Sequence, residues 1–271
     1  MSNSLEHDYA PVCDLYERHL GSALFEPYAI DLAHRVAANC QDGSVLELAC
    51  GTGILTQQLR THLRSTVSLT ATDINLGMLD YAQKKLKDLK GIEWKQADIA
   101  DLPFPAASFN VVVCQFGLMF VPDKDRAFRE MRRVLVKGGV LALSVWDRME
   151  MNPWGVVVHE TVARFFPENP PQFFKAPFNS ADVEVLHRLL TANGFDQIEI
   201  QAVPMECRSS SAKSLAVGMI EGAPILAEIQ ERGGSPGPIV DAVATAFAQT
   251  GGDTPYHSTM QAIVVTARAS K

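Results

Sequence analysis

The sequence predicts a doubly wound α/β domain, in which helices cover both faces of a mainly parallel sheet. Between residues 43 and 146, short apolar, β-branched runs alternate with segments of helical periodicity. The run at 109–114 contains three consecutive valines, which is typical of a central strand buried on both faces. Glycine-rich or acidic residues follow several of these runs, where the loops of such a sheet bind ligands.

Seven strands and four well-defined helices are expected. The strands are predicted at 45–49, 66–72, 92–97, 109–114, 140–146, 195–207 and 260–267. The helices are predicted at 54–63, 76–89, 123–136 and 181–193. Gly138 and Gly139 follow the third helix, and glycine commonly ends a helix. The first forty residues also have helical periodicity, interrupted at Gly21 and Pro27, as do residues 211–249, interrupted at 233–238.

Composition excludes several classes of protein. The 271 residues carry a net charge of −7, whereas a nucleic-acid binder usually presents a basic face. No apolar run approaches the roughly 18–20 residues of a membrane span, and the polar N-terminus does not resemble a signal peptide. Five scattered cysteines fit neither a disulfide framework nor a zinc spacing, so no metal site is expected and a cytoplasmic location is favoured.

The residues after the predicted strands form a constellation suited to a nucleoside. Gly51 and Gly53 would let the backbone turn sharply and let a ligand approach, although a tight strand-to-helix turn would use them equally. Asp73, twenty residues after Gly53, could accept both hydroxyls of a ribose or could cap a helix. Asp98 could accept from an adenine amino group, and the N–H of Ile99 could reach a ring nitrogen.

These segments resemble a known family. The motifs are Val45–Gly53, Thr72–Leu79, Gln96–Phe104, Phe109–Pro122 and Glu130–Gly139, within residues 40–146. As a set they resemble class I S-adenosylmethionine (SAM)-dependent methyltransferases, and most of all the ubiquinone/menaquinone-biosynthesis-like subgroup that methylates small molecules. Asn110 departs from the acid that this family often has in its fourth strand. The resemblance implies a Rossmann-like, doubly wound sheet of seven mostly parallel strands, the last antiparallel, with a helical cap.

The resemblance implies roles for residues at the methionine end of SAM. Gly51 and Gly53 would lie under the methionine moiety, and Glu47 would steady their loop. The carbonyl of Ala49 would contact the ammonium group. Gln115 would face the sulfonium end through its backbone.

It also implies roles at the nucleoside end. Asp73 would hold the ribose, and Ile74 and Met78 would flank the adenine. Asp98 and Ile99 would bind the edge of the adenine ring. No metal ligand is implied by either group of residues.

Four regions of the chain are expected. Residues 1–40 would supply N-terminal helices that form part of a lid, and residues 41–146 the SAM-binding core. Residues 147–179, rich in proline and aromatic residues, would be a cap insertion. Residues 180–271 would complete the sheet, with a helical cap insertion around 208–255. Such helices can also be dimer contacts, so a homodimer is an alternative use of the cap.

The expected function is transfer of a methyl group from SAM to an oxygen, nitrogen or carbon atom of a small, fairly apolar metabolite, with S-adenosylhomocysteine as product. One alternative is a SAM-binding protein that transfers no methyl group, because fold alone does not fix function. The other is an NAD-type oxidoreductase. It explains less, because Thr56 occupies the position of the third glycine of the dinucleotide fingerprint.

The sequence assigns no catalytic residue, since methyl transfer needs placement more than acid–base chemistry. Four histidines could reach the mouth of the site, although a lone histidine is more often a surface or packing residue: His7, His19, His159 and His257. Tyr16 and Phe116 could border the sulfonium. Trp146 and Trp154 could line an apolar substrate site, or simply pack the cap.

Overall fold

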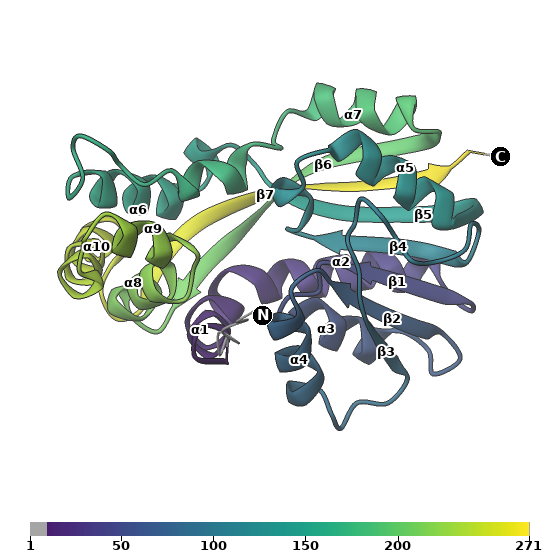
Figure 1. Cartoon of the computed structure of the whole chain (residues 1–271), viewed down its shortest axis with the longest axis horizontal. Helices are drawn as coiled ribbons and strands as arrows, with labels where there is room; N and C mark the ends of the chain where they lie inside the picture. The colour runs from purple at the N-terminus through teal and green to yellow at the C-terminus, as the bar shows by residue number, and fades with distance from the viewer. Residues whose placement is uncertain (1–9, 271) are drawn as a thin grey trace, which may run out of the picture.

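A computed structural model describes residues 10–270 and contains one seven-stranded sheet (Figure 1). The strand order is β3-β2-β1-β4-β5-β7-β6. Strand β7 pairs antiparallel with both β5 and β6, and the pairs among β1–β5 are parallel. The predicted doubly wound sheet, with its last strand antiparallel, is therefore confirmed.

The strands lie close to their expected positions, although β5, β6 and β7 in particular are longer than predicted. They are β1(Ser44–Leu48), β2(Ser68–Asp73), β3(Ile92–Gln96), β4(Phe109–Gln115), β5(Leu135–Trp146), β6(Phe195–Ser209) and β7(Tyr256–Ala269). In the central strands, alternate residues enter different hydrophobic clusters, because successive side chains of a strand point to opposite faces. Leu46 and Val112 belong to one cluster, and Val45 and Val111 to the other.

Helices cover both faces of the sheet. Helices α2(Glu26–Asn39) and α3(Ile54–His62) pack on the face that presents Val45 and Val111. Helices α5(Lys124–Val134) and α7(Val183–Ala192) pack on the opposite face (Figure 1). Helix α4(Leu76–Lys85) connects β2 to β3, whereas β3 and β4 are joined by a loop without a helix.

The N-terminal segment is one continuous run of helix, and the interruption expected at Gly21 and Pro27 is wrong. Helix α1(Ala10–Tyr16) continues as a π-helix, η1(Glu17–Phe25), and then as α2. Gly21 is buried inside the π-helix. Pro27 lies at the junction between η1 and α2, where the hydrogen-bonding pattern changes and the helical run continues despite the missing N–H.

Strands β6 and β7 extend beyond the other five and carry a helical cap (Figure 1). The cap contains α6(Pro153–Ala163), α8(Ala212–Glu221), α9(Ile225–Glu231) and α10(Pro236–Gly251), with the short 3-10 helices η3(Met149–Met151) and η4(Phe173–Phe178) nearby. Helix α10 packs against both α6 and α8. Among residues 10–270, no helix combines the length and the apolar character that a membrane span requires.

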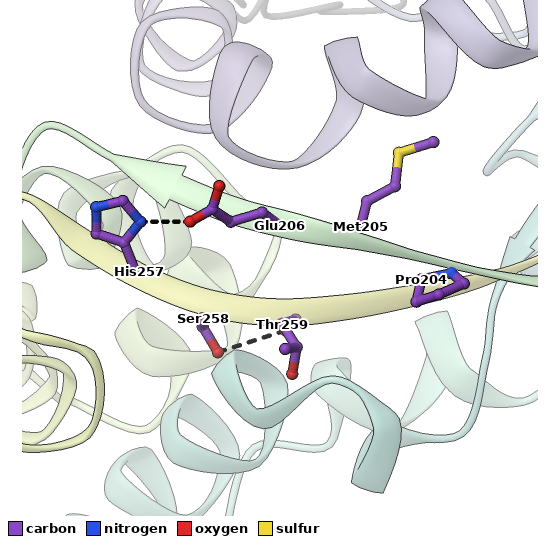
Figure 2. Close-up of a pocket in the computed structure, with 6 residues that line it drawn as sticks. All are labelled: Pro204, Met205, Glu206, His257, Ser258 and Thr259. Carbon is purple, nitrogen blue, oxygen red and sulfur yellow. Dashed lines mark hydrogen bonds and ion pairs between the residues drawn. The ribbon is translucent and has the colours of Figure 1, made fainter.

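The part of the β6–β7 pair that extends beyond the other strands bears an open hollow of about 590 Å³ (Figure 2). It is lined by Pro204, Met205, Glu206, His257, Ser258 and Thr259. Glu206 and His257 form an exposed pair across the two strands, with Oε1 and Nδ1 2.5 Å apart. The hollow follows the arms of β6 and β7, so it is separate from the ends of β1–β4 where a doubly wound sheet binds its ligands.

The boundary between α5 and β5 differs from the expectation. Helix α5 ends at Val134, and β5 begins at once with Leu135, which pairs with Phe109. Gly138 and Gly139 therefore do not end a helix. They form an irregularity within β5, after which Val140 pairs with Val111.

This irregularity predicts unequal effects of two glycine substitutions. Gly138 has φ +73°, but a Cβ there would meet no atom within 4 Å, so Gly138→Ala should cost about 1 kcal/mol of unfolding free energy from the backbone alone. A Cβ on Gly139 would lie 2.9 Å from the Val136 carbonyl oxygen, so Gly139→Ala should cost more. Urea unfolding of both variants measures the difference, and equal, negligible costs would contradict the observed bulge.

Candidate cofactor site

The order of the strands reverses between β1 and β4, and the site lies at the carboxyl ends of these and the neighbouring strands. Strand β1 lies between β2 and β4 and is parallel to both. The loops after β1 and β4 leave the sheet toward opposite sides in such a fold, which opens a crevice between them. Most residues predicted from the sequence follow β1, β2 and β3 or end β2 and β4, and Glu47 lies within β1.

The turn after β1 has the backbone that a ligand cradle needs. Ala49, Gly51 and Gly53 have φ values of +52°, +54° and +80°. A Cβ on Gly51 would meet nothing within 4 Å, so there is open space above this residue. Gly53 precedes α3, which begins without a side-chain cap, so the N–H groups of its first turn face the same region.

Asp73 connects this turn to the end of β2. Its Oδ2 accepts a hydrogen bond from the Gly51 N–H at 2.8 Å, and its Oδ1 accepts from the Asn75 N–H at 2.8 Å. Burial raises the pKa of Asp73, while these backbone hydrogen bonds oppose the shift. The cap of α4 is Asn75, whose side chain accepts from Met78 N. Asp73 is therefore not the helix cap, and its remaining lone pairs are available for a ribose.

Apolar side chains lie next to Asp73. Ile74 is 63% exposed and Met78 is half-buried, so a flat ligand could be covered by both. The loop after β3 is close by, because Ala97 N donates to Asp73 O at 3.1 Å. In this loop the Asp98 carboxylate accepts from Ala100 N at 2.8 Å, and the side chain of Ile99 is buried.

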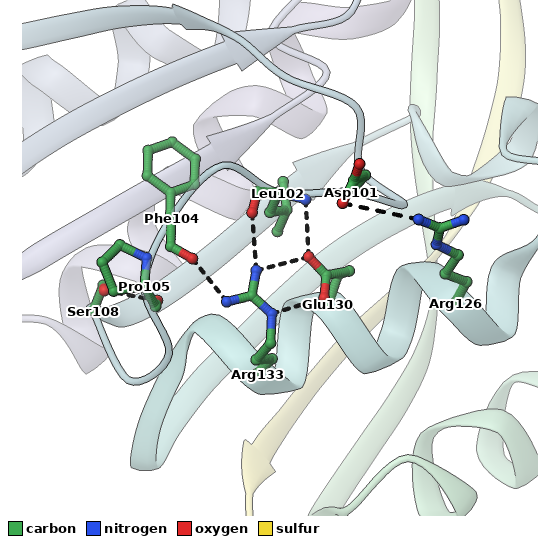
Figure 3. Close-up of polar contacts among 8 residues, drawn as sticks. All are labelled: Asp101, Leu102, Phe104, Pro105, Ser108, Arg126, Glu130 and Arg133. Carbon is green, nitrogen blue, oxygen red and sulfur yellow. Dashed lines mark hydrogen bonds and ion pairs between the residues drawn. The ribbon is translucent and has the colours of Figure 1, made fainter.

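A charged clamp from α5 holds the loop after β3 (Figure 3). Arg133 donates to the carbonyl oxygens of Leu102 at 2.9 Å and Phe104 at 2.7 Å. It also pairs with Glu130 at 2.7 Å, and Glu130 accepts from Leu102 N at 2.8 Å. These hydrogen bonds from Arg133 and Leu102 lower the pKa of Glu130. The clamp replaces the missing helix between β3 and β4 and fixes the segment that carries Asp98 and Ile99.

Glu47 is a buried acid whose carboxylate has no hydrogen bond. It is 1% exposed, and neither carboxylate oxygen has a hydrogen-bond partner. The nearby hydroxyls of Thr52 and Thr56 also lack partners. Burial raises the pKa of Glu47 to about 8, despite opposing contacts with Thr56. The Glu47 carbonyl accepts a hydrogen bond from the Thr72 hydroxyl at 2.8 Å.

Gln115 ends β4 beside a cluster of aromatic rings. Its Nε2 donates to the Phe25 carbonyl oxygen at 3.1 Å, while its Oε1 is buried without a partner. Phe116 stacks on Trp146 with centroids 4.1 Å apart, and Trp154 packs edge-on against Trp146 at 5.3 Å. Two polar atoms beside these rings also lack hydrogen-bond partners. They are Trp154 Nε1 and Ser144 Oγ, the latter on β5.

The N-terminal helical run packs beside α3 and α4, next to the glycine turn. Tyr16 stacks on Phe25 at 4.9 Å, and burial raises the pKa of its hydroxyl well above the ordinary value. Glu17 pairs with Lys85 of α4 at 2.7 Å, and its second oxygen is buried without a partner. Glu17 and Lys85 were not predicted. No motif marks them, because their contact joins residues far apart in the chain.

The histidines named from the sequence have different partners and surroundings. His7 falls outside the described residues. His19 Nδ1 lies 2.8 Å from Ser214 Oγ and joins the N-terminal helix to the cap. His257 on β7 pairs with Glu206 on β6. Burial lowers the pKa of His159 on α6. None of the three described histidines contacts the glycine turn through a hydrogen bond.

The strand reversal, the open glycine turn and the acids after β2 and β3 together define an α/β domain that binds a nucleoside cofactor. Comparison with known proteins makes the class specific, because residues 46–143 match the family described as "Methyltransferase domain". These residues are a class I, SAM-dependent methyltransferase domain of the type found in ubiquinone/menaquinone C-methyltransferases. The predicted family, fold and cofactor are thereby confirmed.

One curated relative is the ubiquinone/menaquinone biosynthesis C-methyltransferase UbiE of Escherichia coli. It is 37% identical over 113 residues, which are 41% of this chain and 45% of UbiE. The alignment thus spans less than half of either protein.

Solved structures share the fold over a greater length. Phosphoethanolamine N-methyltransferase 2 of Haemonchus contortus has a TM-score of 0.63 at 14% identity, covering 99% of this chain and 60% of that one. The YcgJ protein of Bacillus subtilis has a TM-score of 0.59 at 16% identity, covering 90% and 99%. SpnF, described as a cyclase, has a TM-score of 0.57 at 21% identity, covering 97% and 92%. At these identities the likeness concerns the fold alone.

The clamp predicts a stability effect at Arg133. Substitution to Met removes the donors to Leu102 and Phe104 and leaves Glu130 without its cation, so the unfolding free energy should fall by about 1–2 kcal/mol. Arg129→Met is the control, since Arg129 and Asp125 are both largely exposed, and it should cost below ~0.5 kcal/mol. Urea unfolding of both variants compares the two, and similar losses would show that the clamp contributes no more than a surface pair.

The buried carboxyl of Glu47 predicts a pH-dependent stability. The folded chain holds this proton up to about pH 8, whereas the ordinary pKa is 4.5. Ionisation therefore destabilises the ligand-free fold progressively as the pH rises between these values. Glu47→Gln cannot ionise, so its advantage over the wild type should grow by a few kcal/mol from pH 5 to pH 8 in urea unfolding. Parallel pH profiles of the two proteins would contradict the raised pKa.

Proposed function

We propose that this chain transfers a methyl group from SAM to an oxygen, nitrogen or carbon atom of a small, fairly apolar metabolite. The domain match covers residues 46–143 only, so the activity of the whole chain is an inference from the site. When bound, SAM supplies the methyl group on an activated sulfonium. The chain itself binds and orients the two reactants and excludes water.

A single observation carries this proposal. Within residues 10–270, the buried side-chain polar atoms without a hydrogen bond belong to Glu17, Glu47, Thr52, Thr56, Gln115, Ser144 and Trp154. These residues lie at the carboxyl ends of β1, β4 and β5, in the turn and first helix that follow β1, or in the helices packed over them. A buried polar group without a partner costs roughly 1–3 kcal/mol. Their concentration at one edge of the sheet is what a polar ligand site requires.

The residues fit SAM in two groups. At the methionine end, Gly51 and Gly53 provide open space, the Ala49 carbonyl an acceptor for the ammonium, and Glu47 a buried acid beneath the turn. The backbone of Gln115 would face the sulfonium.

The nucleoside group follows β2 and β3. Asp73 has lone pairs free for the ribose, and the exposed side chain of Ile74, with Met78, would flank the adenine. Asp98 and the backbone of Ile99 would bind the edge of the ring, on a loop that the Arg133 clamp keeps in place.

The aromatic cluster after β4 and β5 would bind the methyl acceptor. Phe116, Trp146 and Trp154 form a buried aromatic cluster there, and Gln115 Oε1, Ser144 Oγ and Trp154 Nε1 are polar atoms without partners beside it. This combination favours a fairly apolar molecule with a few hydrogen-bonding groups. The region carries no side chain with an obvious role as general base.

The cap and the N-terminal helices belong to this proposal as the roof of the site. Residues 1–40 would form part of the lid, and residues 147–179 and 208–255 the cap insertions. A homodimer through the cap helices and the absence of a nucleic-acid partner remain predictions. Sedimentation of the purified chain, with and without a DNA duplex, would test both.

Ligand-dependent melting tests the cofactor site first. At about 100 times its dissociation constant, S-adenosylhomocysteine should add roughly 2.7 kcal/mol of stability and raise the melting temperature by a few degrees. NADH at the same concentration should leave the melting temperature unchanged. A shift with NADH alone would overturn the proposal in favour of an oxidoreductase.

Incubation with methyl-labelled SAM and a panel of small metabolites then tests transfer. A labelled product identifies both the acceptor and the atom that is methylated. Binding of S-adenosylhomocysteine without any labelled product would instead favour a protein that uses this fold without methyl transfer.

A further inference from the structure

The N-terminal helical run beside the glycine turn has an unusual geometry. The π-helix η1 spans Glu17–Phe25, and π-helical turns are rare and frequently occur at functional sites. Both of its ends are attached to the strand-end region. Lys85 donates to Glu17 Oε1 at 2.7 Å, and Gln115 donates to the Phe25 carbonyl at 3.1 Å. The irregular segment therefore spans the site from the α4 side to the β4 side.

Glu17 lies against the first turn of α3. A Cβ built on Gly21, one turn further along the π-helix, would be 3.8 Å from Glu17 Oε1 and 3.7 Å from the side chain of Ile54. Ile54 is the first residue of α3, directly after Gly53. The ion pair with Lys85 occupies only Oε1. The second oxygen, Oε2, is buried and has no hydrogen-bond partner.

A second buried acid, Glu47, lies in β1 just before the same turn. Glu47 is 1% exposed, and both of its oxygens lack a partner. Lys85 acts on both acids, because it is bonded to Glu17 and also lowers the pKa of Glu47. Asp73 adds a further carboxylate that raises the pKa of Glu47. A single ammonium group, that of Lys85, is thus close enough to act on both acids.

We propose that Glu17 is a cofactor-binding residue, whose Oε2 accepts a hydrogen bond from the ammonium group of the methionine moiety. This inference rests on the proposed function, since it requires SAM in the site. The ammonium is the one strong cationic donor of that moiety, and a carboxylate is its strongest acceptor. Lys85 holds the other oxygen and so orients the carboxylate. The lid helix then recognises the amino-acid part of the cofactor and not its nucleoside.

Two ligands separate this role from a purely structural one. S-adenosylhomocysteine carries the amino acid, whereas 5′-methylthioadenosine has the same thioether nucleoside without it. Glu17→Gln keeps the size of the side chain but removes its charge. Measured by isothermal titration calorimetry, this variant should bind S-adenosylhomocysteine about ten- to a hundredfold more weakly. Its affinity for 5′-methylthioadenosine should stay within about twofold of the wild type.

Asp31→Asn is the matched control. Asp31 pairs with Arg35 at 2.7 Å, and its side chain is as exposed as that of Glu17, but it lies on α2 away from the turn. This variant should bind both ligands like the wild type. Equal weakening of both ligands by Glu17→Gln would overturn the inference, because Glu17 would then only hold the helix. Failure of the wild type to bind S-adenosylhomocysteine would overturn the proposed function itself.

Discussion

The close approach of the chain just after β1 and β4 is the constraint on which the site depends. A Cβ on Gly117 would lie 2.4 Å from the Cβ of Ala49, so only glycine fits at this position. Ala49 itself adopts a positive φ of 52°, which costs an ordinary residue of the order of 1 kcal/mol. The two loops must therefore diverge immediately beyond the sheet. Their divergence leaves the space above Gly51 and directs the aromatic residues after β4 toward the cap.

Most of the core could be predicted from the sequence because its signals are local. Strands such as β3 and β4 end within a residue of their expected ends, since apolar runs and acidic or glycine stops lie next to each other in the chain. The position of the predicted site residues follows from the same rule, since parallel strands place their carboxyl ends at one edge. The prediction from local sequence was wrong at Gly138 and Gly139. This glycine pair resembles the end of a helix but lies inside β5.

The parts that could not be predicted depend on contacts between distant segments. The π-helical geometry of Glu17–Phe25 has no sequence signature, and the pairing of Glu17 with Lys85 joins residues 68 positions apart. Likewise, the full length of β6 and β7 follows from their pairing with each other, which continues from Phe195–Ala269 to Ser209–Tyr256. Their apolar pattern weakens where side chains leave the core, so the periodicity ends before the strands do.

The continuity of β7 between sheet and cap has a mechanical consequence. A backbone that is hydrogen-bonded along its whole length to β6, and to β5 in the core, makes the cap a rigid extension of the sheet. The N-terminal helical run is attached through side chains instead: Leu20, Ala23 and Leu24 are buried in the main hydrophobic core, and hydrogen bonds such as Tyr81 with Asp14 and His19 with Ser214 add to this packing. The cap and this helical run are therefore fixed by one continuous core, and their positions relative to the strand ends are set when the sheet folds.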